Sequence, residues 1–129
     1  MAQKKKVRRK KILKKVSNGI VHVHSTFNNT IVSVSDSAGK ILCWSSAGTS
    51  GFKGSRKSTP FAASIAARDV AKKARMHGIN EVKVKLKGPG AGKESALRSI
   101  RAEGFLVKGV VDITPMPHNG CRPKKRRRV

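Results

Sequence analysis

Acidic residues are scarce in this chain. Its 129 residues include six Asp and Glu against 30 Lys and Arg, which gives a formal net charge of +24. Self-repulsion of that size disfavours a compact state unless a polyanion neutralises it. So few carboxylates also argue against a two-metal nuclease, which needs several of them around its metal ions. A nucleic acid is therefore the partner that we expect.

Cysteines, aromatic residues and long apolar runs are scarce as well. Cys43 and Cys121 are the only two cysteines, too few for a disulfide framework, so we expect reduced thiols in a cytoplasmic protein. No stretch has the apolar length of a signal peptide or a membrane span, so we expect no contact with a membrane. With 4% aromatic residues and no tyrosine, the main target should be folded RNA rather than splayed single-stranded bases.

The sequence predicts no metal, no cofactor and no enzyme activity. His118 lies near Cys121, but a structural zinc site takes four ligands and no second pair is in sight. Residues 88–93 resemble a phosphate-binding loop of the form GxxxxGK[ST]. The glycine spacing is one residue short, and Glu94 stands where Ser or Thr should coordinate magnesium. His22 and His24 lie two residues apart on the same face of a predicted strand, where we expect them to pack or to donate hydrogen bonds to phosphate.

The basic residues gather toward the two ends of the chain. Residues 1–15 contain nine and residues 118–129 contain six, with no acid in either segment. Two such runs around a domain that is itself basic are typical of arms that follow a phosphate backbone. We predict a basic N-terminal arm at 1–16, one domain at 17–116 and a basic C-terminal arm at 117–129.

Apolar periodicity predicts an α/β domain. Thr59 and Pro60 have the residue types of a helix N-cap and first helical position. The order β-β-β-α-β-α-β predicts one five-stranded mixed sheet with two helices, which is a ribonuclease-H-like architecture. The predicted elements are strands at 20–24, 31–35, 41–45, 81–87 and 106–113 and helices at 61–77 and 94–103.

Two loops and one turn are candidate RNA contacts. The stretch 87–101, KGPGAGKESALRSIR, joins a strand to a helix through a glycine loop. Its backbone N–H groups and the helix N-terminus suit a phosphate, although an ordinary strand-to-helix turn is the alternative. The loop 47–59 is basic and rich in glycine and hydroxyl residues, which can also donate to phosphate. The predicted RNA-binding residues are Lys4, Lys5, Lys6, Arg8, Arg9, Asn28, Asn29, Lys53, Arg56, Lys57, Lys87, Gly88, Gly90, Gly92, Lys93, Arg98, Arg101, His118, Asn119, Arg122, Lys124, Lys125, Arg126, Arg127 and Arg128.

Four motifs carry a resemblance to a known family. They are HSTFNNT at 24–30, KGPGAG at 87–92, DITPMPHNGCRP at 112–123 and the closing KKRRRV. Together they resemble small-subunit ribosomal protein eleven in its bacterial form, over essentially the whole chain. The resemblance implies a non-catalytic ribosomal-RNA-binding protein on the platform of the small subunit, beside the exit-side tRNA site and the messenger RNA path near the Shine-Dalgarno helix. It also implies ribosomal proteins seven and eighteen as neighbours and no homo-oligomer.

Two other classes of function remain as alternatives. A metal-dependent nuclease on a ribonuclease-H-like body would cleave RNA with magnesium, and its activity would depend on Asp36 and Asp112. A DNA-compacting protein is supported by charge alone, and it would prefer duplex DNA to folded ribosomal RNA.

Overall fold

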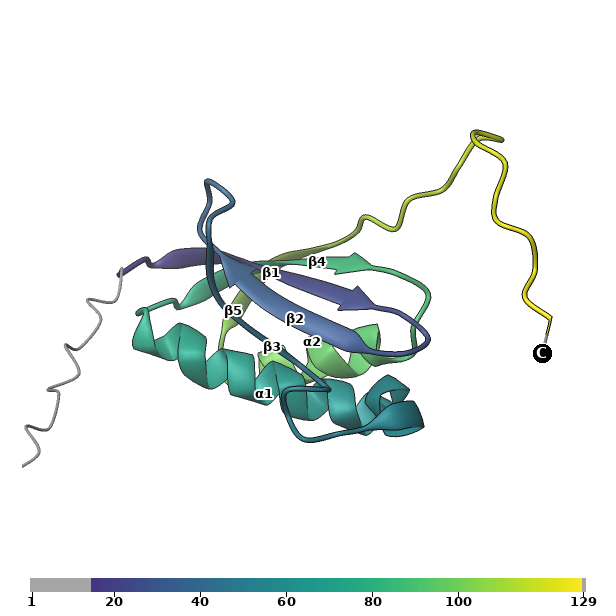
Figure 1. Cartoon of the computed structure of the whole chain (residues 1–129). Helices are drawn as coiled ribbons and strands as arrows, with labels where there is room; N and C mark the ends of the chain where they lie inside the picture. The colour runs from purple at the N-terminus through teal and green to yellow at the C-terminus, as the bar shows by residue number, and fades with distance from the viewer. Residues whose placement is uncertain (1–14, 129) are drawn as a thin grey trace, which may run out of the picture.

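The computed structural model describes residues 15–128 as one α/β domain with a C-terminal extension (Figure 1). The predicted order of strands and helices is confirmed, with a short 3-10 helix added before the first α-helix. The predicted contacts Lys4, Lys5, Lys6, Arg8 and Arg9 lie outside the described residues. The elements are β1 (Asn18–Ser25), β2 (Thr30–Ser35), β3 (Ile41–Ser46), η1 (Gly54–Ser58), α1 (Pro60–Met76), β4 (Glu81–Lys87), α2 (Gly92–Ala102) and β5 (Leu106–Asp112).

The five strands form one mixed sheet in the order β3-β2-β1-β4-β5. The first three strands are an antiparallel meander, while β4 runs parallel to β1 and β5 parallel to β4. Val21 at the centre lies opposite Val34 on one side and Val84 on the other. The fifth strand has an irregularity, because Val82 is opposite Val107 and the next residue, Lys83, is opposite Gly109. The expected mixed sheet is thus confirmed.

Both helices pack on the same face of the sheet (Figure 1). The two crossover connections step in the same direction across the sheet, so equal handedness places α1 and α2 together. Alternate strand residues point toward them, and the small side chains of α1 let that helix approach closely. The core contains Val21, Val23, Val32, Val34, Val82, Val84 and Leu86 from the strands, Ala63, Ala66, Ala67, Val70, Ala71 and Ala74 from α1, and Ala96 and Ile100 from α2.

The boundaries of α1 follow from local sequence. The Thr59 side chain accepts a hydrogen bond from the Ala62 N–H at 3.3 Å, and Pro60 occupies the first helical position, as predicted. Gly78 follows the helix with a φ of +76°, a conformation that glycine adopts without a Cβ clash. Within residues 15–128, neither helix combines the length and the apolar character that a bilayer-spanning segment requires.

Candidate nucleic-acid interface

One edge of the sheet collects most of the predicted contact segments. The parallel strands β1, β4 and β5 all end there, β2 begins there and β3 ends there. We call it the loop edge, and it carries the turn 26–29, the loop 47–59, the loop 88–91 and the start of the chain beyond residue 112. Segments far apart in the sequence thus become neighbours at one end of the domain (Figure 1).

Two buried hydroxyls hold the loop edge together. The Ser25 and Thr30 side-chain oxygens lie 3.1 Å apart at the end of β1 and the start of β2. The Ser25 carbonyl accepts the Gly90 N–H at 3.0 Å, and the Thr30 carbonyl accepts the Ala47 N–H at 3.1 Å. Each of the three loops is therefore tied to the same pair of residues.

The glycine loop packs closely against Ser25 and Thr30. Gly88, Gly90 and Gly92 are buried, and a Cβ on any of them would lie within 2.5 Å of Ser25 or Thr30 atoms. The N–H of Gly90 is bound to Ser25, and the N–H of Gly88 donates to the Thr114 hydroxyl at 3.1 Å. Two of the backbone N–H groups of this loop thus already donate hydrogen bonds within the protein, to the end of β1 and to Thr114. The RNA contact expected of the loop stays a prediction.

Lys93 and Asp112 anchor the C-terminal extension to this loop. Lys93 Nζ lies 3.2 Å from Asp112 Oδ2, and the Thr114 N–H and hydroxyl both donate to Asp112 Oδ1, at 3.0 and 2.6 Å. The Thr114 hydroxyl and amide, followed by Lys93, lower the pKa of Asp112 to about 2. The carboxylate therefore stays ionised and fixes the direction in which the chain leaves β5. Lys93, predicted as a phosphate contact, is also an internal ion-pair partner.

The other basic side chains of this region point outward. Lys87 is exposed at the end of β4, and Arg98 and Arg101 are exposed on α2. Ala91 stands at the N-cap of α2 and supplies no side-chain hydrogen bond, while Glu94 places a negative charge in the first helical turn. That carboxylate already complements part of the positive end of the helix dipole.

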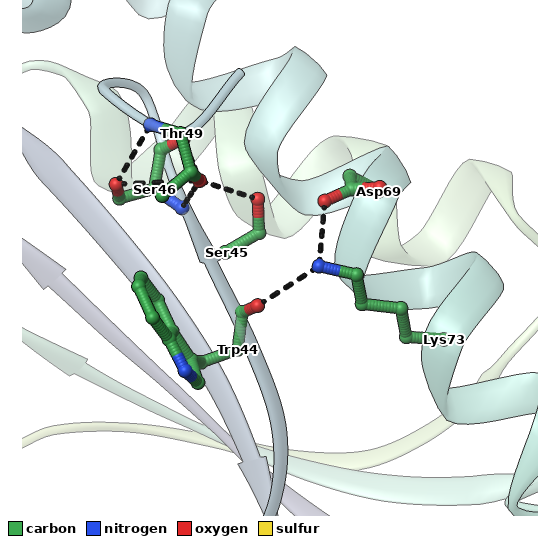
Figure 2. A network of polar contacts seen from close by, with 6 residues as sticks. All are labelled: Trp44, Ser45, Ser46, Thr49, Asp69 and Lys73. Atoms are coloured by element: carbon green, nitrogen blue, oxygen red, sulfur yellow. Dashed lines mark hydrogen bonds and ion pairs between the residues drawn. The ribbon is translucent and has the colours of Figure 1, made fainter. Parts of the chain in front are cut away.

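The loop 47–59 starts from a compact polar turn (Figure 2). The Thr49 hydroxyl accepts the Ser46 N–H at 2.9 Å and lies 3.2 Å from the Ser45 hydroxyl. Beside this turn, Lys73 donates to the Trp44 carbonyl at 3.2 Å and pairs with Asp69, four residues earlier on α1, at 3.1 Å. The loop therefore leaves β3 in a direction that α1 helps to set.

The basic side chains of that loop lie on and around η1. Lys53 and Arg56 are exposed, and Lys57 is half-buried with its stem near Gly48. Phe52 is half-buried, and its ring packs edge-on against Phe61, with 5.9 Å between centroids. Phe52 therefore stabilises the loop, and the basic groups remain on its surface.

The two asparagines of the turn 26–29 differ in exposure and in side-chain hydrogen bonding. Asn28 is exposed, whereas the Asn29 side-chain oxygen accepts the Thr30 N–H at 2.8 Å. The Thr26 hydroxyl accepts the N–H groups of both asparagines, at 3.3 and 3.2 Å. Asn29 thus shapes the turn, and Asn28 lies at its surface.

The two ends of the domain differ in where they leave the sheet. The extension beyond β5 starts at the loop edge, and its predicted contacts are all exposed: His118, Asn119, Arg122, Lys124, Lys125, Arg126, Arg127 and Arg128. The first described residues lie at the opposite edge, where the Val16 N–H donates to the His77 carbonyl at 2.9 Å. The predicted N-terminal arm therefore joins the domain away from the loop edge.

The carboxylates are dispersed over the described part of the chain. Asp36 accepts N–H groups of its own turn, while Glu81 and Glu103 pair with Lys108 and Arg75. Between residues 15 and 128, no three His, Cys, Asp or Glu side chains are grouped so that they could hold a metal ion. Cys43 and Cys121 are both free thiols, and burial raises the pKa of Cys43.

His22 packs into the sheet surface, as expected. Its Nε2 lies 2.9 Å from the Ser35 hydroxyl, and burial, followed by the charge of Lys85, lowers its pKa. A neutral imidazole is therefore the favoured form. His24 is exposed two residues further along β1.

Sequence reasoning missed Ser25, Thr30, Asp112 and Thr114 as organisers of the interface. An Asp followed two residues later by Thr is a local turn signal that could have indicated the bonds between Asp112 and Thr114. Nothing local predicts that Ser25 lies under Gly90, because that contact depends on the parallel pairing of β1 and β4.

The fold, the charge and the exposed loop edge define a small basic α/β protein of the RNA-binding class. A model of the family described as ribosomal protein S11 matches residues 19–128. Because the match covers most of the chain, the protein belongs to the ribosomal protein S11 family. It is therefore a small-subunit ribosomal protein that binds ribosomal RNA and takes part in translation within a ribonucleoprotein, in a family of structural proteins. The family identified from the sequence motifs is confirmed.

Proposed function

We propose that the loop edge and both basic arms hold this protein against the sugar-phosphate surface of folded ribosomal RNA on the platform of the small subunit. The observation that carries this proposal is the convergence of three loops and the C-terminal extension at one edge. Exposed Lys53 and Arg56 lie on the loop 47–59, exposed Lys87 lies at the end of β4, and Arg98 and Arg101 lie on α2. Such contacts position a protein on RNA without reading base sequence.

We also propose the finer features that the sequence and the family resemblance led us to expect. The chain is of the bacterial form and acts in the cytoplasm without catalysis, membrane contact or self-association. Its domain spans 17–116 between arms at 1–16 and 117–129. It supports the exit-side tRNA site and the Shine-Dalgarno region near the messenger RNA, with ribosomal proteins seven and eighteen as neighbours. The basic charge of the chain and the small size of its domain support a role of this kind.

Salt dependence of RNA binding tests the proposed mode. The full-length chain is titrated into a folded small-subunit ribosomal RNA fragment at several salt concentrations. Each phosphate contact should contribute about 0.7 to 0.9 to the slope of log affinity against log salt, so about ten contacts give a slope near 7 to 9. A flat response contradicts phosphate-based binding, and a preference for duplex DNA in competition contradicts the ribosomal target.

Variants that remove charges test which lysines and arginines contact the RNA. We expect the double substitution Lys53→Gln and Arg56→Gln to lower the slope by roughly 1.5. The matched control, Lys40→Gln with Lys72→Gln, removes two exposed charges away from the loop edge and should leave the slope unchanged. Substituting Lys93 and Arg98 with alanine should weaken binding to all sequences alike. Equal effects of the test and control pairs would argue for diffuse charge rather than the loop edge.

A further inference from the structure

The sheet has one face that no described element covers. Both helices lie on the other face (Figure 1). The strand residues that alternate with the core residues therefore face away from the helices. We call this surface the open face. It contains Ile20, His22 and His24 of β1, Ile31 and Ser33 of β2, Trp44 of β3, Lys83, Lys85 and Lys87 of β4, and Val111 of β5.

One row of side chains crosses four strands at the middle of the open face. The register places Trp44 opposite Ser33, Ser33 opposite His22, and His22 opposite Lys85. Neighbouring strands are about 4.8 Å apart, so the backbones at Trp44 and His22 are about 10 Å apart. Because the Ser33 side chain is small, the surface is shallow between the Trp44 indole and the His22 imidazole. The ammonium group of Lys85 lies at the end of the row.

The two rings differ in how they are held. The Trp44 side chain is on the opposite side of β3 from α1 (Figure 2), and the residue is 53% exposed. The His22 ring is half-buried and fixed by its contact with the Ser35 hydroxyl at 2.9 Å. An exposed indole beside a fixed imidazole is a surface on which a planar group can stack.

The charge of the open face indicates the class of its partner. Lys83, Lys85 and Lys87 alternate along β4, which spaces them about 7 Å apart on one face. Glu81, at the start of the same strand, is paired with Lys108. A second copy of this chain, at a net charge of +24, and its own basic arms would all be repelled. The face is therefore complementary to a polyanion.

We propose that the open face binds an unpaired segment of RNA, with a base stacked on Trp44 and successive phosphates on Lys83, Lys85 and Lys87. This inference rests on the proposed function only in that the chain binds ribosomal RNA. It adds a second surface with a different chemistry, because the loop edge meets phosphates and the open face also meets a base. An acidic protein segment would neutralise the lysines, but its carboxylates would not stack on the Trp44 ring as a nucleic-acid base does.

Trp44 is the only tryptophan of the chain, so its fluorescence reports on this surface alone. The full-length protein is titrated with a single-stranded oligoadenylate and, separately, with a blunt RNA duplex of equal phosphate number. We expect saturable quenching by the single strand and little quenching by the duplex, since duplex bases are not free to stack. Equal quenching by both, or none by the single strand, overturns the proposal.

Variants separate stacking from charge, with binding of a labelled oligoadenylate followed by anisotropy. Trp44→Leu should weaken binding by about 5- to 150-fold, the range measured for loss of one stacked base, and Trp44→Phe should restore part of it. Lys85→Gln should reduce the salt slope, whereas Lys72→Gln on the helical side should not. Unchanged binding by Trp44→Leu overturns the proposal.

Binding of the folded ribosomal RNA fragment is measured in parallel to distinguish the two proposals. If Trp44→Leu binds that fragment normally and also binds oligoadenylate normally, the open-face inference fails and the loop-edge proposal stands. If the unaltered chain does not bind the fragment, the loop-edge proposal fails. A photo-crosslinking residue at position 44 in assembled subunits gives the final test. A crosslink to an RNA base supports the open-face contact, and a crosslink to protein, or none, overturns it.

Discussion

Gly90 donates its N–H to the Ser25 carbonyl at 3.0 Å, and a methyl group on Gly90 would lie 2.2 Å from the Ser25 hydroxyl oxygen. The loop between β4 and α2 therefore lies directly against the end of β1. This contact joins the glycine loop to the residue that precedes the turn 26–29.

Gly90→Ala tests that contact. The added methyl group would also approach the Thr26 carbonyl oxygen to 2.5 Å, so backbone must move. We expect the free energy of unfolding, measured with urea, to fall by about 1 to 3 kcal/mol, which is typical of an overpacked site. Gly120→Ala is the matched control, because its Cβ meets no atom within 4 Å. Equal stability of the two variants would contradict the close packing described here.

The ionisation of Asp112 predicts a pH-dependent anchor for the C-terminal extension. Its folded pKa of about 2 is below the ordinary 3.8, so the carboxylate contributes stability that is complete above pH 3.8 and is lost as the pH falls through 2. We expect the amide resonances of Thr114 and Gly88 to titrate near pH 2. Asp112→Asn should remove this titration. A midpoint near 3.8 would show that the anchor does not form in solution.

The lowered pKa of His22 predicts a second dependence of stability on pH, in a pH range below 6.5. Because burial and Lys85 lower the His22 pKa below 6.5, the folded state binds fewer protons than the unfolded state. Stability should therefore be full above pH 6.5 and decrease as the pH falls through the lower folded pKa. Titration of the His22 ring by NMR measures the pKa shift. Lys85→Gln should raise the His22 pKa part of the way back toward 6.5, because it removes a positive charge. An unshifted His22 pKa in the unaltered protein would contradict the burial of the ring beside Lys85.

The N-cap of α1 gives a prediction about the end of the loop 47–59. Thr59→Ala removes the acceptor of the Ala62 N–H and should lower the free energy of unfolding by about 1 kcal/mol, measured with urea. Thr59→Ser keeps the hydroxyl and should recover most of this loss. Ser64→Ala on the same helix is the control, because its hydroxyl donates to the Phe61 carbonyl at 2.7 Å and caps no N–H group of the helix end. Comparable losses for Thr59→Ser and Thr59→Ala would show that the cap does not stabilise the helix.

Local patterns were sufficient to predict most of the elements. The alternation at 81–87 predicted a strand with Val82, Val84 and Leu86 on one face and three lysines on the other. The structure buries the three apolar side chains, exposes Lys83 and Lys87 and leaves Lys85 half-buried. Thr59 and Pro60 marked the start of α1 because capping depends on neighbouring residues alone. Periodicity and capping are short-range properties, so sequence reveals them directly.

The chemistry of the interface was harder to predict, because it depends on contacts between distant segments. The composition of the glycine loop indicated free amides, but Ser25 and Thr114 come from elsewhere in the chain and accept two of them. Likewise, Lys93 and Asp112 are 19 positions apart and meet only because β4 and β5 are parallel neighbours. The open face could not be predicted from the strand pattern, since it exists because both crossovers place their helices on one side.

The buried hydroxyl pair of Ser25 and Thr30 connects RNA binding to correct folding of the loop edge. Because these residues order three loops before RNA arrives, that conformational entropy is lost during folding and does not reduce affinity afterwards. A damaged copy with a loosened pair would be a weaker ligand even with every cation intact.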